Sequence, residues 1–126
     1  MKLRLRCGLA AGLSLAAGIF VFLYRGPGWK PLRHSAGDFI VVLFLHFLAA
    51  VVVPRRPISL ALGVWVFACL IEALQMLKLT SPSDPWWVQA SFGSTFDPWD
   101  LLAYSLGAVC AGTLHRRLLQ GATREG

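Results

Sequence analysis

Glu72 and Gln75 are the two residues of this chain whose types and position are best suited to chemistry. Both lie near one end of an apolar run at residues 58–77. An ionisable side chain in the hydrocarbon of a bilayer costs about 2.5–3.5 kcal/mol on insertion scales, so both side chains are expected to face protein or water rather than lipid. A carboxyl in such a place can carry a proton, act as a general acid or contact a ligand. It can also simply bond to a neighbouring helix, and the amide of Gln75 has the same two interpretations.

Polar residues of the last apolar segment are expected at a similar depth. Asp100 and Tyr104 are four residues apart and therefore share one face of a helix. Residues 97–100 have the form of a capping box, so Asp97 is either a structural cap or a site residue. Arg25 either extends to the lipid headgroups or pairs with one of the acids. The candidate ligand-binding pocket therefore contains Arg25, Asp38, Glu72, Gln75, Asp97, Asp100 and Tyr104, and the sequence assigns no catalytic residue.

The histidines and cysteines do not indicate a metal site or a cofactor. His46 lies near the middle of the second apolar segment, where hydrogen-bonded packing is more common than metal binding, and zinc needs more ligands than any cluster here supplies. His34 falls in a predicted loop and His115 at a predicted membrane edge. The three cysteines lack the spacing of a metal site or a disulfide. We therefore expect no metal and no cofactor.

The composition places these residues in a bilayer. The 126 residues are 56% hydrophobic and only 14% charged, with a mean hydropathy of +0.62, which is too apolar for a soluble domain of this size. Four segments approach the roughly 17–25 residues of a spanning helix, and the run at 39–45 lacks the alternation of a membrane β-strand. We expect an all-α fold, a four-span transmembrane helical bundle that forms a single integral membrane domain over residues 1–126. The expected spans are about residues 7–24, 38–54, 58–78 and 98–119.

The connections between the spans can be predicted from their turn residues. Residues 25–37 are rich in glycine and proline, which predicts a compact outer loop, and Asp38 is expected to open the second span as a helix cap. The turn at 54–57 is too short for anything but an antiparallel hairpin. Residues 81–96 are the longest outer loop, where an Asp-Pro-Trp-Trp run predicts a short interfacial helix.

The placement of charge predicts the orientation of the chain. With four spans, the two termini and the 54–57 turn lie on one side, which holds eight of the twelve Lys and Arg residues. The positive-inside rule then places both termini in the cytoplasm, as in a multi-pass protein of a bacterial cytoplasmic membrane. The basic residues flank spans in twos and threes rather than forming a stripe with aromatic residues, so no nucleic-acid partner is expected. The lipid bilayer with its anionic headgroups is the expected partner.

Several motifs, taken in order, resemble a known family. They are Tyr24-Arg25-Gly26-Pro27, Asp38, Glu72-x-x-Gln75 and Thr95-Phe96-Asp97-x-x-Asp100-x-x-x-Tyr104-x-x-Gly107. This set resembles a DUF2809-type family of small bacterial membrane proteins of unknown function, over nearly the whole chain. More remotely, Glu-x-x-Gln followed by Asp-x-x-x-polar-x-x-Gly resembles VanZ-like proteins, which are associated with glycopeptide resistance. The VanZ pattern has an arginine before the last span and an asparagine four residues after the aspartate. This chain has no arginine at 88–92, and it has Tyr104 where the VanZ pattern has the asparagine.

Three classes of function stay open on these grounds. The first, which we favour, is a non-enzymatic, envelope-associated binding or accessory protein. Its outward-facing polar pocket around Glu72 would bind a lipid headgroup, a cell-wall precursor or another membrane protein. The second is a small membrane enzyme that acts on an envelope lipid, with Glu72 or Asp100 as acid or base. The third is a proton-linked transporter or pore that uses Glu72 and His46.

Overall fold

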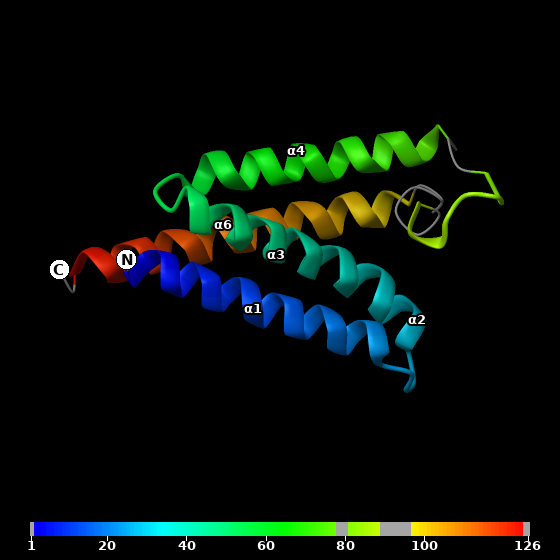
Figure 1. Ribbon diagram of the computed structural model, residues 1–126, viewed down its shortest axis with the longest axis horizontal. Coiled ribbons are helices and arrows are strands. Elements are labelled where there is room, and N and C mark those ends of the chain that lie inside the picture. Colours follow the sequence, from blue (N-terminus) through cyan, green and yellow to red (C-terminus); the bar gives the residue numbers. More distant parts are fainter. Residues whose placement is uncertain (1, 78–80, 89–96, 125–126) are drawn as a thin grey trace.

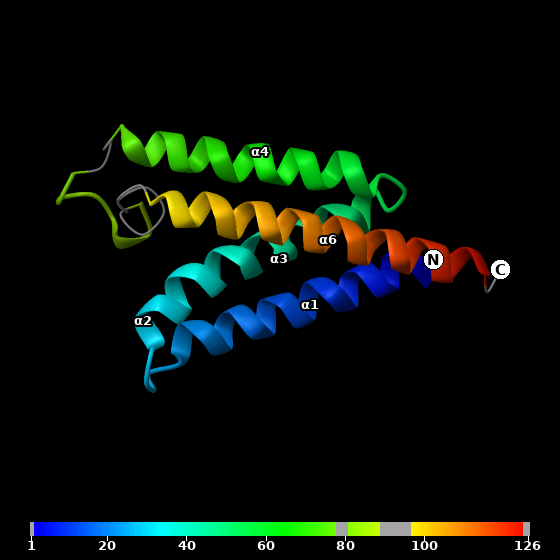
Figure 2. The ribbon, with the colours of Figure 1, turned by 180° about the vertical axis from the view of Figure 1, so that it is seen from behind.

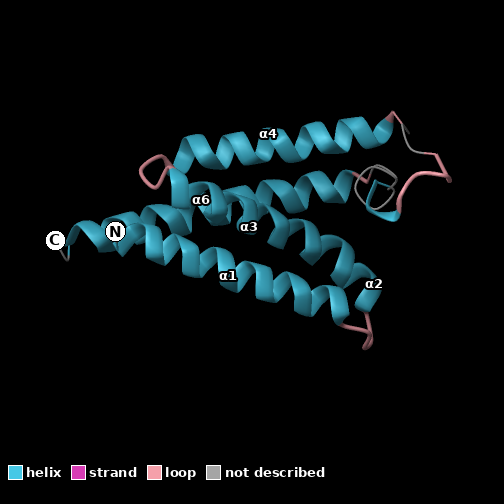
Figure 3. Ribbon diagram, viewed as in Figure 1, coloured by secondary structure: helices cyan, strands magenta, loops and turns pink. Residues whose placement is uncertain are grey.

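The computed structural model describes residues 2–77, 81–88 and 97–124, and all regular structure in these ranges is helical (Figure 3). The all-α prediction is confirmed for this part of the chain. The segments α2, η1 and α3 follow one another without a break and form one helix from Trp29 to Val52. The elements in order are α1 (Lys2–Leu23), α2 (Trp29–Pro31), the π-helical turn η1 (Leu32–Ala36), α3 (Gly37–Val52), α4 (Pro57–Met76) and α6 (Pro98–Arg124).

The long helices lie lengthwise beside one another (Figure 1). Helices α3 and α6 are central, because each packs against the other and against both α1 and α4. Seen from behind, α1 and α4 lie on opposite sides of this central pair (Figure 2). The two chain termini lie at one end of the bundle, which we call the terminal end, and α2 lies at the other, which we call the α2 end (Figures 1 and 2).

Three helical stretches are long and apolar enough to cross a membrane, which indicates a multi-pass membrane protein. They are Lys2–Leu23, Trp29–Val52 and Pro57–Met76. Helix α6 is long enough at 27 residues but is not among them, because it is less apolar. Its central position explains this composition. A face that includes Asp100, Tyr104 and His115 is buried against other helices and does not need to be apolar enough for lipid.

The second long helix begins earlier than the sequence predicted. It begins at Trp29, because Gly28 turns the chain with a φ of 71° and Pro31 stands in the first helical turn, where an N–H would have no helical partner. The expected loop therefore shrinks to residues 24–28. The prediction that Asp38 caps this helix is wrong, because Asp38 lies two turns inside it and the free N–H groups are at Trp29.

Two other predicted features, the cap at Asp97 and the short turn after α3, agree with the structure. Helices α1 and α6 extend beyond the expected spans, to Lys2 and to Arg124 respectively. Asp97 caps α6, since its Oδ1 accepts a hydrogen bond from the backbone N–H of Trp99 at 3.0 Å. Helix α3 ends and α4 begins on either side of the short turn that predicted a hairpin. In the long loop, residues 86–88 are helical. Residues 89–96 lie outside the described part of the chain, so the interfacial helix stays a prediction.

Helices α3 and α6 come into close contact at Gly107. A Cβ at this position would lie 3.0 Å from the backbone oxygen of Phe39 and 3.1 Å from the Cβ of Val42, so glycine is the residue that fits. Tyr104 and Ala111, on the same face of α6, are also buried. Small residues that let two backbones approach are a main source of helix association in membranes, where lipid is as apolar as the side chains.

Gly107→Ala is expected to lower the thermal unfolding midpoint of the purified protein in detergent, whereas Gly63→Ala is not. Alanine is favoured over glycine inside a helix by about 1 kcal/mol at both positions. At Gly107 the added methyl meets the α3 backbone, and overpacking costs about 1–3 kcal/mol, whereas no described residue lies within 4 Å of a Cβ at Gly63. Equal midpoints for the two variants would contradict the close contact.

Candidate functional site

Glu72 lies inside the bundle rather than against lipid. On the inner face of α4, Glu72 is 1% exposed and Gln75 is 8% exposed. The hydroxyl of Tyr104 on α6 donates a hydrogen bond to Oε2 of Glu72 at 3.3 Å. The other oxygen, Oε1, is buried and has no hydrogen-bond partner among the described residues. Oε1 is therefore a whole oxygen of the carboxyl that can still accept a hydrogen bond from a ligand or a water, or take up a proton.

Three further side chains meet at the α2 end of the bundle. Asp38 and Asp100 come from the two central helices, and a carboxyl oxygen of one lies within 4.8 Å of a carboxyl oxygen of the other. His34 lies one turn before Asp38, and its Nδ1 is 3.9 Å from Oδ1 of Asp100. One nitrogen or oxygen from each of the three lies within 4.8 Å of the others. Two carboxyls at such a distance need a shared proton or a cation between them.

These residues form one cluster of acidic and polar side chains, which we call the acidic pocket and which consists of His34, Asp38, Glu72, Asp100 and Tyr104. Asp100 is 6% exposed, and its charge and that of Glu72 act on each other. The pocket is thus acidic on the α3, α4 and α6 sides, with His34 as its exposed rim. Lys and Arg form no ion pair with its carboxyls in the described part of the chain.

Two of the predicted site residues have other contacts. Arg25 is exposed, and its Nη1 donates to the backbone oxygens of Phe22 at 3.0 Å and Tyr24 at 3.3 Å. Its guanidinium also stacks 5.1 Å from the centre of the Trp29 ring. The guanidinium therefore satisfies the carbonyl end of α1 instead of pairing with an acid. Asp97 is half-buried and caps α6.

The sequence did not predict His34 as a member of the pocket. It was expected in a loop, but the helix that begins at Trp29 includes it. The spacing of four between His34 and Asp38 then places both on one helix face. The spacing between His34 and Asp38 could have indicated that His34 belongs to the pocket, but only if the segment was known to be helical.

A second polar site lies nearer the terminal end, between the same two helices. His46 of α3 and His115 of α6 are both 0% exposed, and His46 Nε2 lies 3.1 Å from His115 Nδ1. His115 Nε2 lies 2.6 Å from the carbonyl oxygen of Pro54, in the turn between α3 and α4. The sequence treated the two histidines separately, because 69 positions separate them and nothing in the pattern pairs them.

The Pro54 carbonyl sets the tautomers of this histidine pair. A carbonyl oxygen only accepts hydrogen bonds, so Nε2 of His115 carries a proton and donates to it. Nδ1 of a neutral His115 then accepts from Nε2–H of His46. The lone pair of His46 Nδ1 remains, and this atom is buried without a partner among the described residues. The result is a directed chain of hydrogen bonds from α3 to the turn.

Comparison with known proteins identifies the family of this chain but gives no information about its function. A family model described as "Protein of unknown function (DUF2809)" matches residues 28–108, which is more than half of the chain. The match includes every residue of the acidic pocket and His46, whereas His115 lies beyond it. Nothing among the curated proteins or the solved structures matches the chain.

Removal of either histidine is expected to destabilise the protein, with His115→Phe more harmful than His46→Phe. Loss of one partner leaves a buried polar atom unpaired, which costs about 1–3 kcal/mol, and His115 has two partners. A double-mutant cycle, measured by unfolding in mixed detergent and SDS, should give a coupling of about 0.6–1.7 kcal/mol. Additive effects of the two substitutions would contradict the hydrogen bond between the rings.

Proposed function

We propose, for a chain that belongs to the DUF2809 family of proteins of unknown function, that it is a membrane-embedded binding protein whose acidic pocket takes a cationic group. The observation that supports this most directly is a set of buried carboxyls with no Lys or Arg paired to them in the described ranges. Charges that are taken out of water need compensation from a partner of opposite charge. A bound cation or a held proton supplies that compensation.

The geometry suits a group with several donor or coordination directions. Two ligands of one metal ion at about 2.1 Å lie at most about 4.2 Å apart, and the atoms of His34, Asp38 and Asp100 lie within 4.8 Å of one another. A small closure of the pocket would therefore bring them to a divalent ion. A protonated amine, with three donors, matches the same acceptors. The ligand is thus a divalent metal ion or the amine of a lipid headgroup or cell-wall precursor.

The setting that we propose is the bacterial cytoplasmic membrane, with the pocket facing outward. Helix α6 would be the fourth span, because it lies lengthwise in the centre of the bundle (Figure 1). The positive-inside rule favours cytoplasmic termini, because Lys2, Arg4, Arg55 and Arg56 lie together beside the last turns of α6, which themselves contain arginines.

The orientation predicts which positions a membrane-impermeant thiol reagent can reach in whole cells. Pro27→Cys, in the turn between α1 and α2, is expected to be labelled, whereas Arg55→Cys, in the turn between α3 and α4, is labelled only after the cells are opened. The native chain is the control, since Cys7 is buried and Cys69 and Cys110 are half-buried within helices. Labelling of Arg55→Cys in intact cells would reverse the proposed topology.

Proton-linked transport is the second candidate, and the histidine pair is the observation that favours it. A set of titratable groups lies at each end of the contact between α3 and α6: the acidic pocket at one end and the His46–His115 pair at the other. Intramembrane carboxyls and histidines in series are typical of proton relays. Proteoliposomes with a pH gradient would separate the candidates. Proton flux that is abolished by both Glu72→Gln and His46→Phe would favour transport over binding.

Asp100→Asn is expected to weaken cation binding at least tenfold, because it removes a buried charge that lies within reach of both other ligands. Binding of Mn²⁺, Zn²⁺ and phosphoethanolamine would be measured by calorimetry on the protein in nanodiscs. Asp84→Asn is the matched control, since Asp84 lies in the segment 81–88 outside the pocket. Absence of binding for all three probes, or equal losses in the two variants, would refute the proposal. Preference for phosphoethanolamine over the ions would identify an amine ligand.

A further inference from the structure

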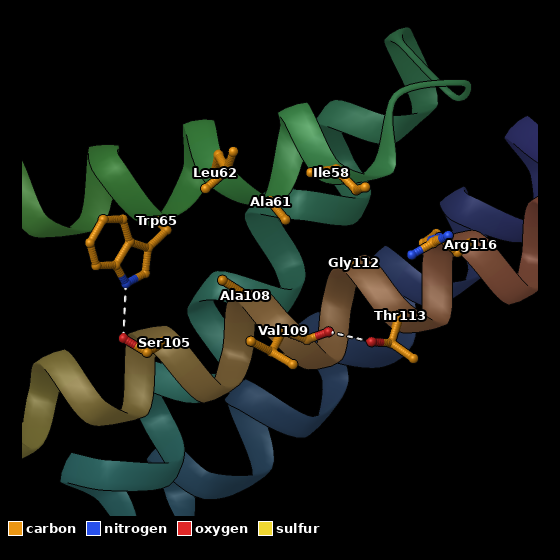
Figure 4. A pocket seen from close by; sticks show the side chains of 10 residues that line it. All are labelled: Ile58, Ala61, Leu62, Trp65, Ser105, Ala108, Val109, Gly112, Thr113 and Arg116. Carbon is orange, nitrogen blue, oxygen red and sulfur yellow. Dashed lines mark hydrogen bonds between the residues drawn. The ribbon is translucent and has the colours of Figure 1, made fainter.

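A groove runs along the surface between α4 and α6, on the side away from α1 (Figure 4). Its volume is about 440 Å³. Leu62 of α4 and Val109 of α6 form its rims and are exposed. The groove is separate from the acidic pocket, and the two share no residue.

Small residues on both helices form the floor of the groove. Ala61 of α4 faces Ala108 and Gly112 of α6, and a Cβ at Gly112 would lie 3.3 Å from that of Ala61. The two backbones are therefore close along the floor, while the larger side chains stand on either side (Figure 4). The shape is that of a narrow apolar channel open to the surroundings of the bundle.

The two ends of the groove differ in chemistry. At the end nearer the acidic pocket, the indole Nε1 of Trp65 donates to the hydroxyl of Ser105 at 2.9 Å, which links the two helices across the groove (Figure 4). At the other end lies Arg116, which is exposed and has no hydrogen bond or ion pair to any described residue. Ile58, in the first turn of α4, lines the same end.

The length of the groove matches one leaflet of a bilayer. Ser105 and Arg116 are eleven positions apart on α6, which is about 16 Å at 1.5 Å per residue. The hydrocarbon core of a bilayer is about 30 Å thick, so a single leaflet is about 15 Å. If Arg116 lies at the headgroup level, Ser105 and Trp65 lie near the middle of the membrane.

We infer that this groove holds one acyl chain of an anionic phospholipid, whose phosphate is bound by Arg116. The charge of Arg116 complements a phosphate, and the apolar rims complement a chain. The turn with Arg55 and Arg56 directly precedes the α4 end of the groove and adds positive charge at the same level. Basic pockets between helices at the cytoplasmic surface bind anionic headgroups. The lipid comes from the leaflet at the terminal end.

The test uses the full-length protein in nanodiscs of zwitterionic phosphatidylcholine with a quarter of anionic phosphatidylglycerol. Phosphatidylglycerol retained after release into detergent would be counted by native mass spectrometry. We expect Arg116→Gln to lower retention about fivefold and Arg116→Lys to keep most of it. Arg117→Gln is the matched control, because Arg117 is the next residue, is also exposed and does not line the groove. The Arg117→Gln variant should retain as much phosphatidylglycerol as the native chain does.

A second pair of variants tests the apolar part of the groove. Val109→Trp places a large ring on the rim at an exposed position and is expected to reduce retention of the lipid without unfolding the protein. Leu106→Trp, which is exposed on the same helix outside the groove, should have no effect. Equal losses for Arg116→Gln and Arg117→Gln would overturn the inference, because the attraction would then be a general surface charge. A native dimer that Val109→Trp dissociates would also overturn it, since a second copy would then cover the groove.

Discussion

The contact between α3 and α6 at Gly107 is the interaction on which both polar sites depend. These helices run in the same direction (Figure 1), so a close contact at one point brings the segments before it and after it on both helices near each other. On one side of it Asp38 meets Asp100, and on the other His46 meets His115. A larger residue at position 107 would separate the helices and both pairs with them. The lack of a side chain at Gly107 thus allows the two helices to bring both pairs of polar residues together.

Both sites place polar groups in a protein whose other buried side chains are mostly apolar. Such groups contribute little net stability in a membrane, where interhelical hydrogen bonds average below about 1 kcal/mol. They do make the arrangement unique, because a shift of one helix by a turn would leave each of them unpaired. The histidine pair illustrates this most clearly, since its bonds reach from α3 through α6 to the carbonyl oxygen of Pro54. Helix α3, helix α6 and the turn at Pro54 must therefore all be in place for these hydrogen bonds to form.

Much of the fold could be predicted because it follows from local rules. Apolar runs indicated where the helices are, and a short turn with two prolines predicted the hairpin between α3 and α4. The start of the second helix could not be predicted in the same way. The glycines and prolines at 26–31 are compatible with either a loop or a helix that begins at residue 29, and packing against neighbouring helices decides between them.

The site could be predicted in part. Glu72 and Tyr104 were recognised because a polar residue in an apolar run requires an explanation, and they do contact each other. His34 and His115 were not, because their roles depend on partners distant in sequence that only the tertiary arrangement identifies. Arg25 shows the opposite error. Its charge suggested an acidic partner, whereas backbone carbonyl groups of its own helix end were nearer.

The π-helical turn η1 (Leu32–Ala36) precedes the first acid of the pocket. Such a turn amounts to one residue inserted into an otherwise regular α-helix, and π-turns are frequent at functional sites. One residue of an α-helix corresponds to about 100° of rotation. Compared with a regular helix, the residues that precede the insertion are therefore rotated by about 100° around the helix axis relative to α3. Gain or loss of one residue here would therefore change which side chain stands at the rim of the pocket, by a change of length rather than of composition.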